Sequence, residues 1–155
     1  MSSAGVSLRG AAPGDAQRIA DVLLASRKTF VAFAPLAHTD DEVRGWVRDV
    51  LLPAGGVTVA VADATIVAFM DTCRDGEASW VKQLFAMPGH TGQGVGSMLL
   101  ARALETLPPP IRLYCFQQNS RARTFYERHG FRAIAFGDGG ANVEGCPDVL
   151  YERTG

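Results

Sequence analysis

The chain has 155 residues, 47% hydrophobic and 20% charged, a composition typical of one globular domain with a sizeable core, so we expect a single domain over residues 1–155. The formal net charge of −1, with no run of basic residues, gives little electrostatic support for binding nucleic acid. No early stretch has the plan of a signal peptide and no run is long enough to cross a membrane, so we expect a cytoplasmic protein without a membrane partner.

The first part of the chain is predicted to form a short strand and two amphipathic helices. Residues 6–10 alternate weakly and indicate the strand. The first helix opens at Gly14-Asp15, with Asp15 near the cap. Its buried stripe is formed by Ile19, Val22, Leu23 and Ser26. Thr39 and Glu42 have the spacing of a capping box, which indicates a second helix that ends near Pro53. Its apolar side carries Val43, Trp46, Val47, Val50 and Leu51.

A three-stranded meander is predicted next, over residues 57–61, 65–70 and 78–87. Asp63-Ala64 is the expected hairpin turn between the first two strands, and residues 74–77 form the second turn. The third strand runs directly into a glycine loop and then a helix. The meander is therefore followed directly by the segment whose pattern most clearly indicates a function.

That segment is Leu84 to Leu100, which has the order strand, glycine loop, helix. Gly92, Gly94 and Gly96 alternate across a tight turn, and apolar residues follow at helical spacing from Val95. The start of a helix leaves backbone N–H groups without partners and carries the positive end of the helix dipole. Glycines let the backbone approach a ligand closely, so the segment is suited to bind phosphate or pyrophosphate.

Three kinds of phosphate site compete for this segment. A P-loop needs Gly-Lys-Ser/Thr after its glycines, and no lysine follows here. A dinucleotide fingerprint has the spacing G-x-G-x-x-G in the first βα turn, with an acid about 20 residues further on. Here the spacing is G-x-G-x-G past the middle of the chain, and the only acid of the helix is Glu105. The third alternative is the pyrophosphate of coenzyme A.

The rest of the chain predicts a mixed α/β fold. Residues 111–116 form a strand that can only be parallel, or nearly so, to residues 78–87, because a whole helix separates the two. Asn119-Ser120 caps a helix over residues 121–129, and Gly130 ends it. Residues 137–146 form a glycine-rich loop between the last strands, over residues 131–136 and 148–152. This order predicts a mixed sheet with helices on both faces and a right-handed central crossover.

The cysteine and histidine residues give no sign of a metal centre. Cys73, Cys115 and Cys146 lie far apart, and neither they nor the three histidines have metal-ligand spacing. The odd number of cysteines also argues against a disulfide framework. We therefore expect no metal and a reducing compartment.

Two segments resemble the GNAT family of acetyl-coenzyme A-dependent N-acyltransferases. Residues 86–100 are similar to the family's pyrophosphate loop, Q/R-x-x-G-x-G/A, with Gly94 and Gly96 at the glycine positions. Residues 119–131 match every specified position of its later motif, N-x-x-A-x-x-F-Y-x-x-x-G-F. Thr91 stands at the Q/R position, a departure that leaves the backbone amides unchanged. The order of elements extends the resemblance over nearly the whole chain.

The resemblance implies a fold and a co-substrate. The fold is α/β of the mixed α+β kind, with a central, mostly antiparallel sheet whose two neighbouring parallel strands splay apart and with helices on both faces. The pantetheine arm of acetyl-coenzyme A, the implied co-substrate, lies between those strands and bonds to the free edge of residues 84–86. The implied cofactor-binding residues are Leu84, Phe85, Ala86, Thr91, Gly92, Gln93, Gly94, Val95, Gly96, Ser97 and Asn119.

The implied reaction is direct transfer of an acyl group from a thioester to an amine. A backbone N–H near Phe85 or Ala86 can stabilise the charge that develops on the thioester oxygen. Tyr126, which the resemblance places near the sulfur, is the candidate acid for the leaving thiolate. Asp71, Glu77 and Glu144 are candidate bases, with a water relay as the alternative. The acceptor pocket is expected to form from Phe30, Phe33, His38, Trp46 and residues 137–146.

The sequence therefore predicts an N-acetyltransferase that acts on an amine of a small molecule or a peptide. The alternative is a non-catalytic acyl-coenzyme A binding or sensing module, which has no need of the phenol of Tyr126. A nucleotide-binding oxidoreductase is a more distant alternative because the glycine spacing disfavours it. The resemblance is also compatible with a homodimer, which the residues alone do not indicate.

Overall fold

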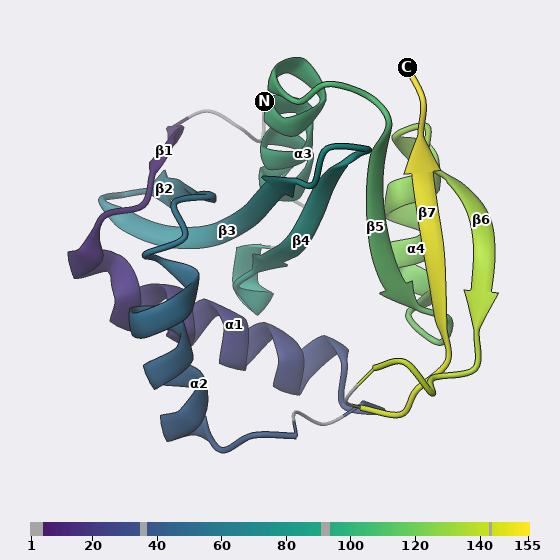
Figure 1. Ribbon diagram of the computed structural model, residues 1–155. Coiled ribbons are helices and arrows are strands. Elements are labelled where there is room, and N and C mark those ends of the chain that lie inside the picture. Colours follow the sequence, from purple (N-terminus) through teal and green to yellow (C-terminus); the bar gives the residue numbers. More distant parts are fainter. Residues whose placement is uncertain (1–4, 35–36, 91–93, 143) are drawn as a thin grey trace.

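The computed structural model describes residues 5–34, 37–90, 94–142 and 144–155 (Figure 1). Within these ranges the strands form one seven-stranded sheet in the order β1-β2-β3-β4-β5-β7-β6. All neighbouring strands are antiparallel except β4 and β5. The strands are β1 (Val6–Gly10), β2 (Val57–Ala62), β3 (Thr65–Arg74), β4 (Ser79–Ala86), β5 (Ile111–Phe116), β6 (Arg132–Gly137) and β7 (Asp148–Arg153).

Helices cover both faces of the sheet, as the sequence predicts (Figure 1). One apolar cluster lies between the sheet and the N-terminal helices, and includes Ile19, Val47 and Phe69. The other lies between the opposite face and the later helices, and includes Leu99 and Tyr151. The helices are α1 (Ala16–Phe30), α2 (Asp40–Trp46), α3 (Val95–Thr106) and α4 (Ser120–Arg128). None of the helices in the described ranges has the length and apolar character needed to cross a membrane.

The start of α1 differs from the prediction. A 3₁₀ turn over Pro13–Asp15 precedes the helix, and the side chain of Asp15 makes no capping bond to α1. Instead, Asp15 accepts from the backbone N–H of Ala12 and pairs with Arg9 at 2.8 Å, and the bond from Arg9 is the largest cause that lowers the pKa of this carboxyl. The predicted buried stripe of α1 is confirmed at all four positions, Ile19, Val22, Leu23 and Ser26.

The second helix begins as predicted but presents a narrower apolar side. The side chain of Thr39 accepts from the N–H of Glu42, and Glu42 bonds back to Thr39. The helix continues through a π-helical turn over Val47–Leu51, and Val43, Val47 and Leu51 are buried. Trp46 and Val50 were expected on the same side, but they are 38% and 54% exposed. Each precedes a buried residue by one position, about 100° around the helix, and so points away from the core.

The two parallel strands separate after a short contact. β4 and β5 pair only at Ser79–Ile111 and Trp80–Arg112. On its other side, β4 stays paired with β3 through Ala86, with a register shift between Asp71 and Thr72. The edge of β4 that faces β5 is therefore unpaired over residues 82–86, which is the splay that the resemblance implies. Strand β7 lies between β5 and β6, an order that the sequence did not predict.

Candidate active site

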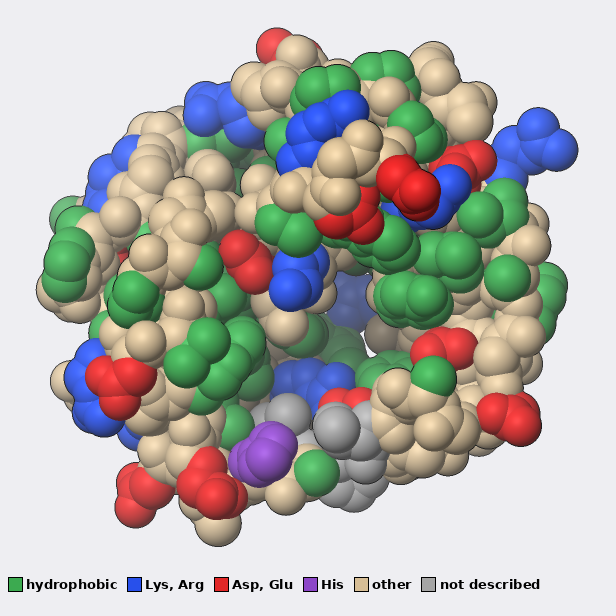
Figure 2. All heavy atoms as spheres, viewed as in Figure 1, with side chains coloured by type: hydrophobic (Ala, Val, Ile, Leu, Met, Phe, Trp, Pro, Cys, Tyr) green, Lys and Arg blue, Asp and Glu red, His purple; other side chains and the backbone are tan. Residues whose placement is uncertain are grey.

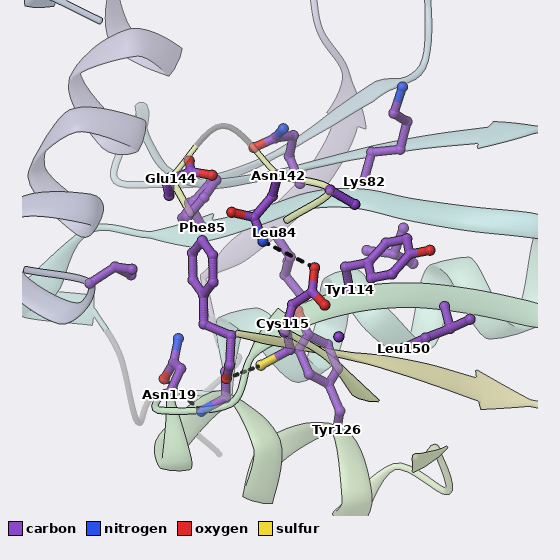
Figure 3. Close-up of a pocket in the computed structure, with 18 of the residues that line it drawn as sticks. Lys82, Leu84, Phe85, Tyr114, Cys115, Asn119, Tyr126, Asn142, Glu144 and Leu150 are labelled. Carbon is purple, nitrogen blue, oxygen red and sulfur yellow. Dashed lines mark hydrogen bonds between the residues drawn. The ribbon is translucent and has the colours of Figure 1, made fainter. Parts of the chain in front are cut away.

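The gap between β4 and β5 opens into two adjoining cavities of about 600 Å³ and about 490 Å³. The larger lies against β5, β6, β7 and the loop before β7, and the smaller lies against the starts of α3 and α4. Six residues line both: Val31, Leu84, Phe85, Asn119, Ala122 and Tyr126. We call the larger the sheet-side cavity and the smaller the helix-side cavity. The two cavities therefore adjoin at these residues, of which Leu84, Phe85, Asn119 and Tyr126 are labelled in Figure 3.

The helix-side cavity contains the described end of the glycine loop. Gly94 has φ +80°, a left-handed conformation that favours glycine, and it directly precedes α3. Gly96 approaches α4 so closely that a Cβ there would lie 3.4 Å from the ring of Phe125. Val95 is buried in the core, so only its backbone can face a ligand. The predicted positions Thr91, Gly92 and Gln93 lie outside the described residues.

Two arginines that the sequence reasoning missed also line the helix-side cavity. Arg121 and Arg128 both belong to α4. The guanidinium of Arg121 lies 4.3 Å from the centre of the Phe30 ring, which fixes it at the rim through a cation–π contact. These cations and the N-terminus of α3 make the cavity favourable for an anion. The signal was present in the unspecified positions of the later motif, two and nine residues after Asn119.

Tyr126 and Asn119 stand at the junction of the cavities. The ring of Tyr126 packs edge-on against Phe125 and Phe131, with centroids 5.2 and 5.9 Å away. Burial, and secondarily the nearby Cys115, raises the pKa of Tyr126, so its phenol is protonated at neutral pH. Within the described part of the chain its hydroxyl has no hydrogen-bond partner. Asn119 caps α4 by accepting from the N–H of Ala122 at 3.1 Å, so the cap and the cavity wall are the same residue.

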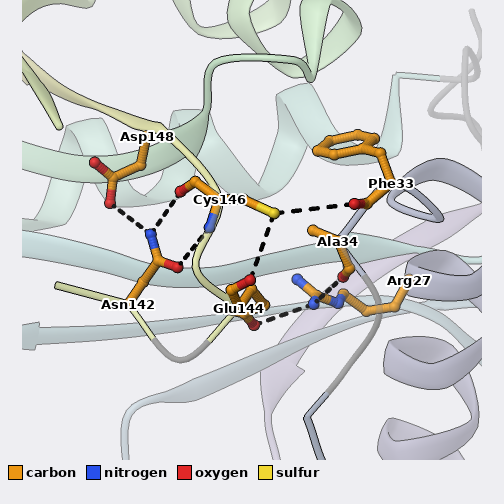
Figure 4. Close-up of polar contacts among 7 residues, drawn as sticks. All are labelled: Arg27, Phe33, Ala34, Asn142, Glu144, Cys146 and Asp148. Carbon is orange, nitrogen blue, oxygen red and sulfur yellow. Dashed lines mark hydrogen bonds and ion pairs between the residues drawn. The ribbon is translucent and has the colours of Figure 1, made fainter. Parts of the chain in front are cut away.

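An ion pair between two lining residues of the sheet-side cavity, Arg27 and Glu144, is drawn in Figure 4. Arg27, at the end of α1, donates to Glu144 at 3.1 Å and to the backbone oxygen of Ala34 at 2.9 Å. The side chains of Arg27 and Glu144 are only 10% and 14% exposed. Burial lowers the pKa of Arg27, while the charge of Glu144 opposes that effect. Nε of Arg27 is buried and has no hydrogen-bond partner, and among the described residues it is the one buried side-chain nitrogen or oxygen in this situation.

The three candidate bases are found in different places. Glu144 lines the sheet-side cavity. Glu77 lies in the turn before β4, at the end where β4 and β5 are still paired, and it lines neither cavity. Asp71 is buried within β3, also outside both linings, and burial raises its pKa. The geometry therefore retains only Glu144 of the three.

Of the four helical-region residues expected in the acceptor pocket, one lines either of these two cavities. Phe30 lines the helix-side cavity instead, whereas Phe33, His38 and Trp46 line neither. Phe33 packs against Phe116 at 5.9 Å, and His38 is turned toward Glu42. The loop over residues 137–146 does contribute, through Gly137, Ala141, Asn142 and Glu144. The sequence reasoning missed the strand residues of the wall, among them Lys82, Tyr114, Phe136 and Leu150.

The splayed strands, the glycine-led helix and the adjoining cavities define an acyltransferase. A model of the acetyltransferase (GNAT) domain matches residues 53–133, more than half of the chain. The chain therefore belongs to the GNAT acetyltransferase family. The family and the fold class inferred from the sequence are confirmed, whereas the site residues and the acceptor stay predictions.

Solved structures share this fold along almost the whole chain. The apo form of YjaB from Escherichia coli is 24% identical, with a TM-score of 0.76 over 97% of this chain and 98% of that one. The PaiA N-acetyltransferase of Thermoplasma acidophilum, in complex with coenzyme A, is 20% identical, with a TM-score of 0.74 over 97% and 99%. Naa50 of Arabidopsis thaliana, in complex with a bisubstrate analogue CoA-Ac-MVNAL, is 18% identical, with a TM-score of 0.72 over 97% and 99%. At these identities the likeness shows the fold alone, and no curated protein sequence matches the chain.

Proposed function

We propose that this acyltransferase moves an acetyl group from acetyl-coenzyme A directly to an amine, which makes it an N-acetyltransferase. The observation that carries the proposal is the meeting of the two cavities at Phe85, Asn119 and Tyr126. The helix-side cavity suits a long anionic thioester, and the sheet-side cavity suits an amine. Direct transfer requires both substrates to be bound at once with the reacting atoms in contact, and two cavities that adjoin at the same residues support such a mechanism.

The helix-side cavity suits coenzyme A in its charge and in the backbone groups that border it. The amides at the start of α3, with Ser97 beside them and Thr91, Gly92 and Gln93 before them, bind the pyrophosphate in this proposal. Arg121 and Arg128 add positive charge along the same wall. The unpaired edge of β4 over residues 84–86 accepts the pantetheine arm as a further strand. The neighbour from Thermoplasma acidophilum, whose structure is a coenzyme A complex, supports this assignment.

The residues at the junction account for each step of the transfer. The neutral amine attacks the thioester carbon, a C–N bond forms, and the C–S bond breaks. A backbone N–H of Phe85 or Ala86 stabilises the charge on the carbonyl oxygen. The phenol of Tyr126 gives its proton to the leaving sulfur and recovers one from solvent. The proton lost by the amine passes to Glu144, directly or through water, because Glu144 is the base candidate that lines the cavity.

The number of domains, the cellular location and the oligomeric state of the protein are proposals too. The sheet runs without interruption from β1 to β6, which supports one domain over residues 1–155. A cytoplasmic location and a homodimer stay predictions. The proposed acceptor is an amine of a small molecule or of a peptide.

Release of free thiol from acetyl-coenzyme A in the presence of a panel of amines tests the proposal. Tyr126→Phe should lower turnover about 100-fold, as expected for loss of a general acid, while the affinity for coenzyme A stays within about twofold. The matched control is Tyr151→Phe, because its hydroxyl binds Glu127 and Arg123 away from both cavities and is expected to affect stability rather than turnover. Unchanged turnover in Tyr126→Phe refutes its role as the acid. Binding of coenzyme A without thiol release for any amine would instead support a sensing module.

A further inference from the structure

We propose that Tyr114 makes this enzyme selective for acceptor amines that carry an aromatic ring. The inference rests on the proposed function, because it assigns the acceptor to the sheet-side cavity. Tyr114 lies on β5 and lines that cavity, and 61% of the residue is exposed. An exposed aromatic side chain in the wall of a cavity is available to a ligand, so its surroundings decide what it can bind.

The ring of Tyr114 is supported from one side. Trp80, on the neighbouring strand β4, stacks on it with ring centroids 5.8 Å apart and an interplanar angle of 15°. Trp80 does not line the cavity, so the indole supports the phenol from the side away from it. Near-parallel stacking holds the Tyr114 ring in one orientation and leaves its remaining surface for a second ring. An offset stack of this kind is a favourable geometry for aromatic pairs.

Trp80 is itself held in place by a carboxylate. Its indole Nε1–H donates to Asp75 Oδ2 at 2.8 Å. The other oxygen of Asp75 accepts from the backbone N–H groups of Ala78 and Glu77, at 2.9 and 3.1 Å. These hydrogen bonds, with that to Ala78 the largest, lower the pKa of Asp75, so the carboxylate is charged at neutral pH. The wall is therefore fixed before a ligand arrives, which reduces the entropy lost on binding.

The other residues of the cavity are arranged to bind an amine with an apolar end. Leu150 and Ala135, which are opposite each other on β7 and β6, add apolar surface to the wall. Asp148 adds a carboxylate that favours an amine, and Glu144 adds a second carboxylate that is paired with Arg27. Figure 2 shows hydrophobic side chains gathered over β5 to β7, beside the hollow at the centre of this face. An arylalkylamine would match both the apolar and the polar parts of the cavity, with its ring against Tyr114 and its amine toward Tyr126 and Glu144.

The test compares three amines that differ in the group attached to the same ethylamine unit: 2-phenylethylamine, 2-cyclohexylethylamine and ethylamine. Wild-type enzyme should show the lowest KM for phenylethylamine. Tyr114→Leu should raise that KM roughly fivefold, the size expected for loss of one aromatic pair, and leave the KM values for ethylamine and acetyl-coenzyme A unchanged. Tyr114→Phe should keep the preference, because the ring rather than the hydroxyl makes the contact.

Two further variants distinguish an effect of the Tyr114–Trp80 pair from a general effect of the substitutions on the fold. Trp80→Leu should weaken the preference to an intermediate value, because Tyr114 then loses its support. Trp46→Leu is the matched control, since it removes an exposed indole that lines neither cavity, and its kinetics should equal those of the wild type. Melting temperatures of all variants verify that the fold is kept.

The outcomes distinguish this inference from the proposed function. Equal kcat/KM for phenylethylamine and cyclohexylethylamine in the wild type, or an unchanged ratio in Tyr114→Leu, overturns the role of Tyr114. If no amine is acetylated, the proposed function fails, and binding is then read from fluorescence. In Trp46→Phe, Trp80 is the only indole of the chain. A saturable change in Trp80 fluorescence or, failing that, saturable heat of phenylethylamine binding in calorimetry that disappears with Tyr114→Leu would still support an aromatic site, and absence of binding by both would refute it.

Discussion

Replacement of Glu144 by leucine should destabilise the fold strongly, because it leaves the guanidinium of Arg27 buried without its counter-ion. The two side chains are 10% and 14% exposed, so the charge left on Arg27 would be largely buried and would meet water only through the sheet-side cavity that both residues line. Arg27 would keep one acceptor, the backbone oxygen of Ala34, while its Nε already has no partner in the described residues. Removing one partner of a buried pair typically costs about 3–5 kcal/mol.

We expect the lower end of that range, about 3 kcal/mol, because Arg27 and Glu144 line a cavity that water can enter. For a chain of this length, such a loss corresponds to a fall in melting temperature of roughly 6–12 °C. Urea unfolding, followed by fluorescence and circular dichroism, measures the free energy of unfolding. The double variant Arg27→Met with Glu144→Leu should recover most of the loss, because it removes both charges and leaves an apolar contact.

The control is an ion pair on the surface. Lys28 and Asp40 are 2.8 Å apart, compared with 3.1 Å for Arg27 and Glu144, but their side chains are 62% and 54% exposed. Lys28→Met should therefore cost less than about 1 kcal/mol, and the cost should fall further in high salt. If Glu144→Leu behaves like this control, or if the double variant is as unstable as the single one, the reasoning from burial is wrong.

Two further predictions concern the glycine loop and the buried acid of β3. Gly94→Ala should cost about 1–2 kcal/mol of stability and weaken coenzyme A binding, because Gly94 has φ +80°; calorimetry is the readout, and Gly89→Ala, where φ is not positive, should leave both unchanged. Burial raises the pKa of Asp71 above its usual value of 3.8, and the charge of Lys82 opposes this only in part. The folded state therefore favours the protonated acid, and that contribution to stability is present below pH 3.8 and lost as the pH rises through the higher folded-state pKa. Asp71→Asn should raise the melting temperature at pH 7. It should also reduce the fall in melting temperature between pH 3.8 and the folded-state pKa of Asp71. A lower melting temperature of the variant at pH 7 would contradict this.

Much of the fold could be predicted from the sequence because its signals are local. The capping box of Thr39 and Glu42 joins residues three apart, and the structure contains both of its hydrogen bonds. The turn at Asp63-Ala64 has positive φ at both residues, as a tight hairpin requires. Alternation and helical spacing identified each of the strands and helices in order. The caps and turns are stabilised by groups that are neighbours in the sequence, and the strands and helices were recognised from patterns that extend over a few residues.

Only the tertiary structure decided which residues share a cavity wall. Arg27 and Glu144 are 117 positions apart, and nothing near either residue in the sequence indicates the other. Tyr114 lines the cavity while Trp46 does not, because the separation of β4 and β5 exposes one and a shift of about 100° around a helix turns the other outward. The order β5-β7-β6 likewise depends on pairing between distant segments, because β7 forms hydrogen bonds with both β5 and β6. Contacts between distant residues depend on the packing of whole faces, and that information belongs to the folded chain rather than to any short stretch of sequence.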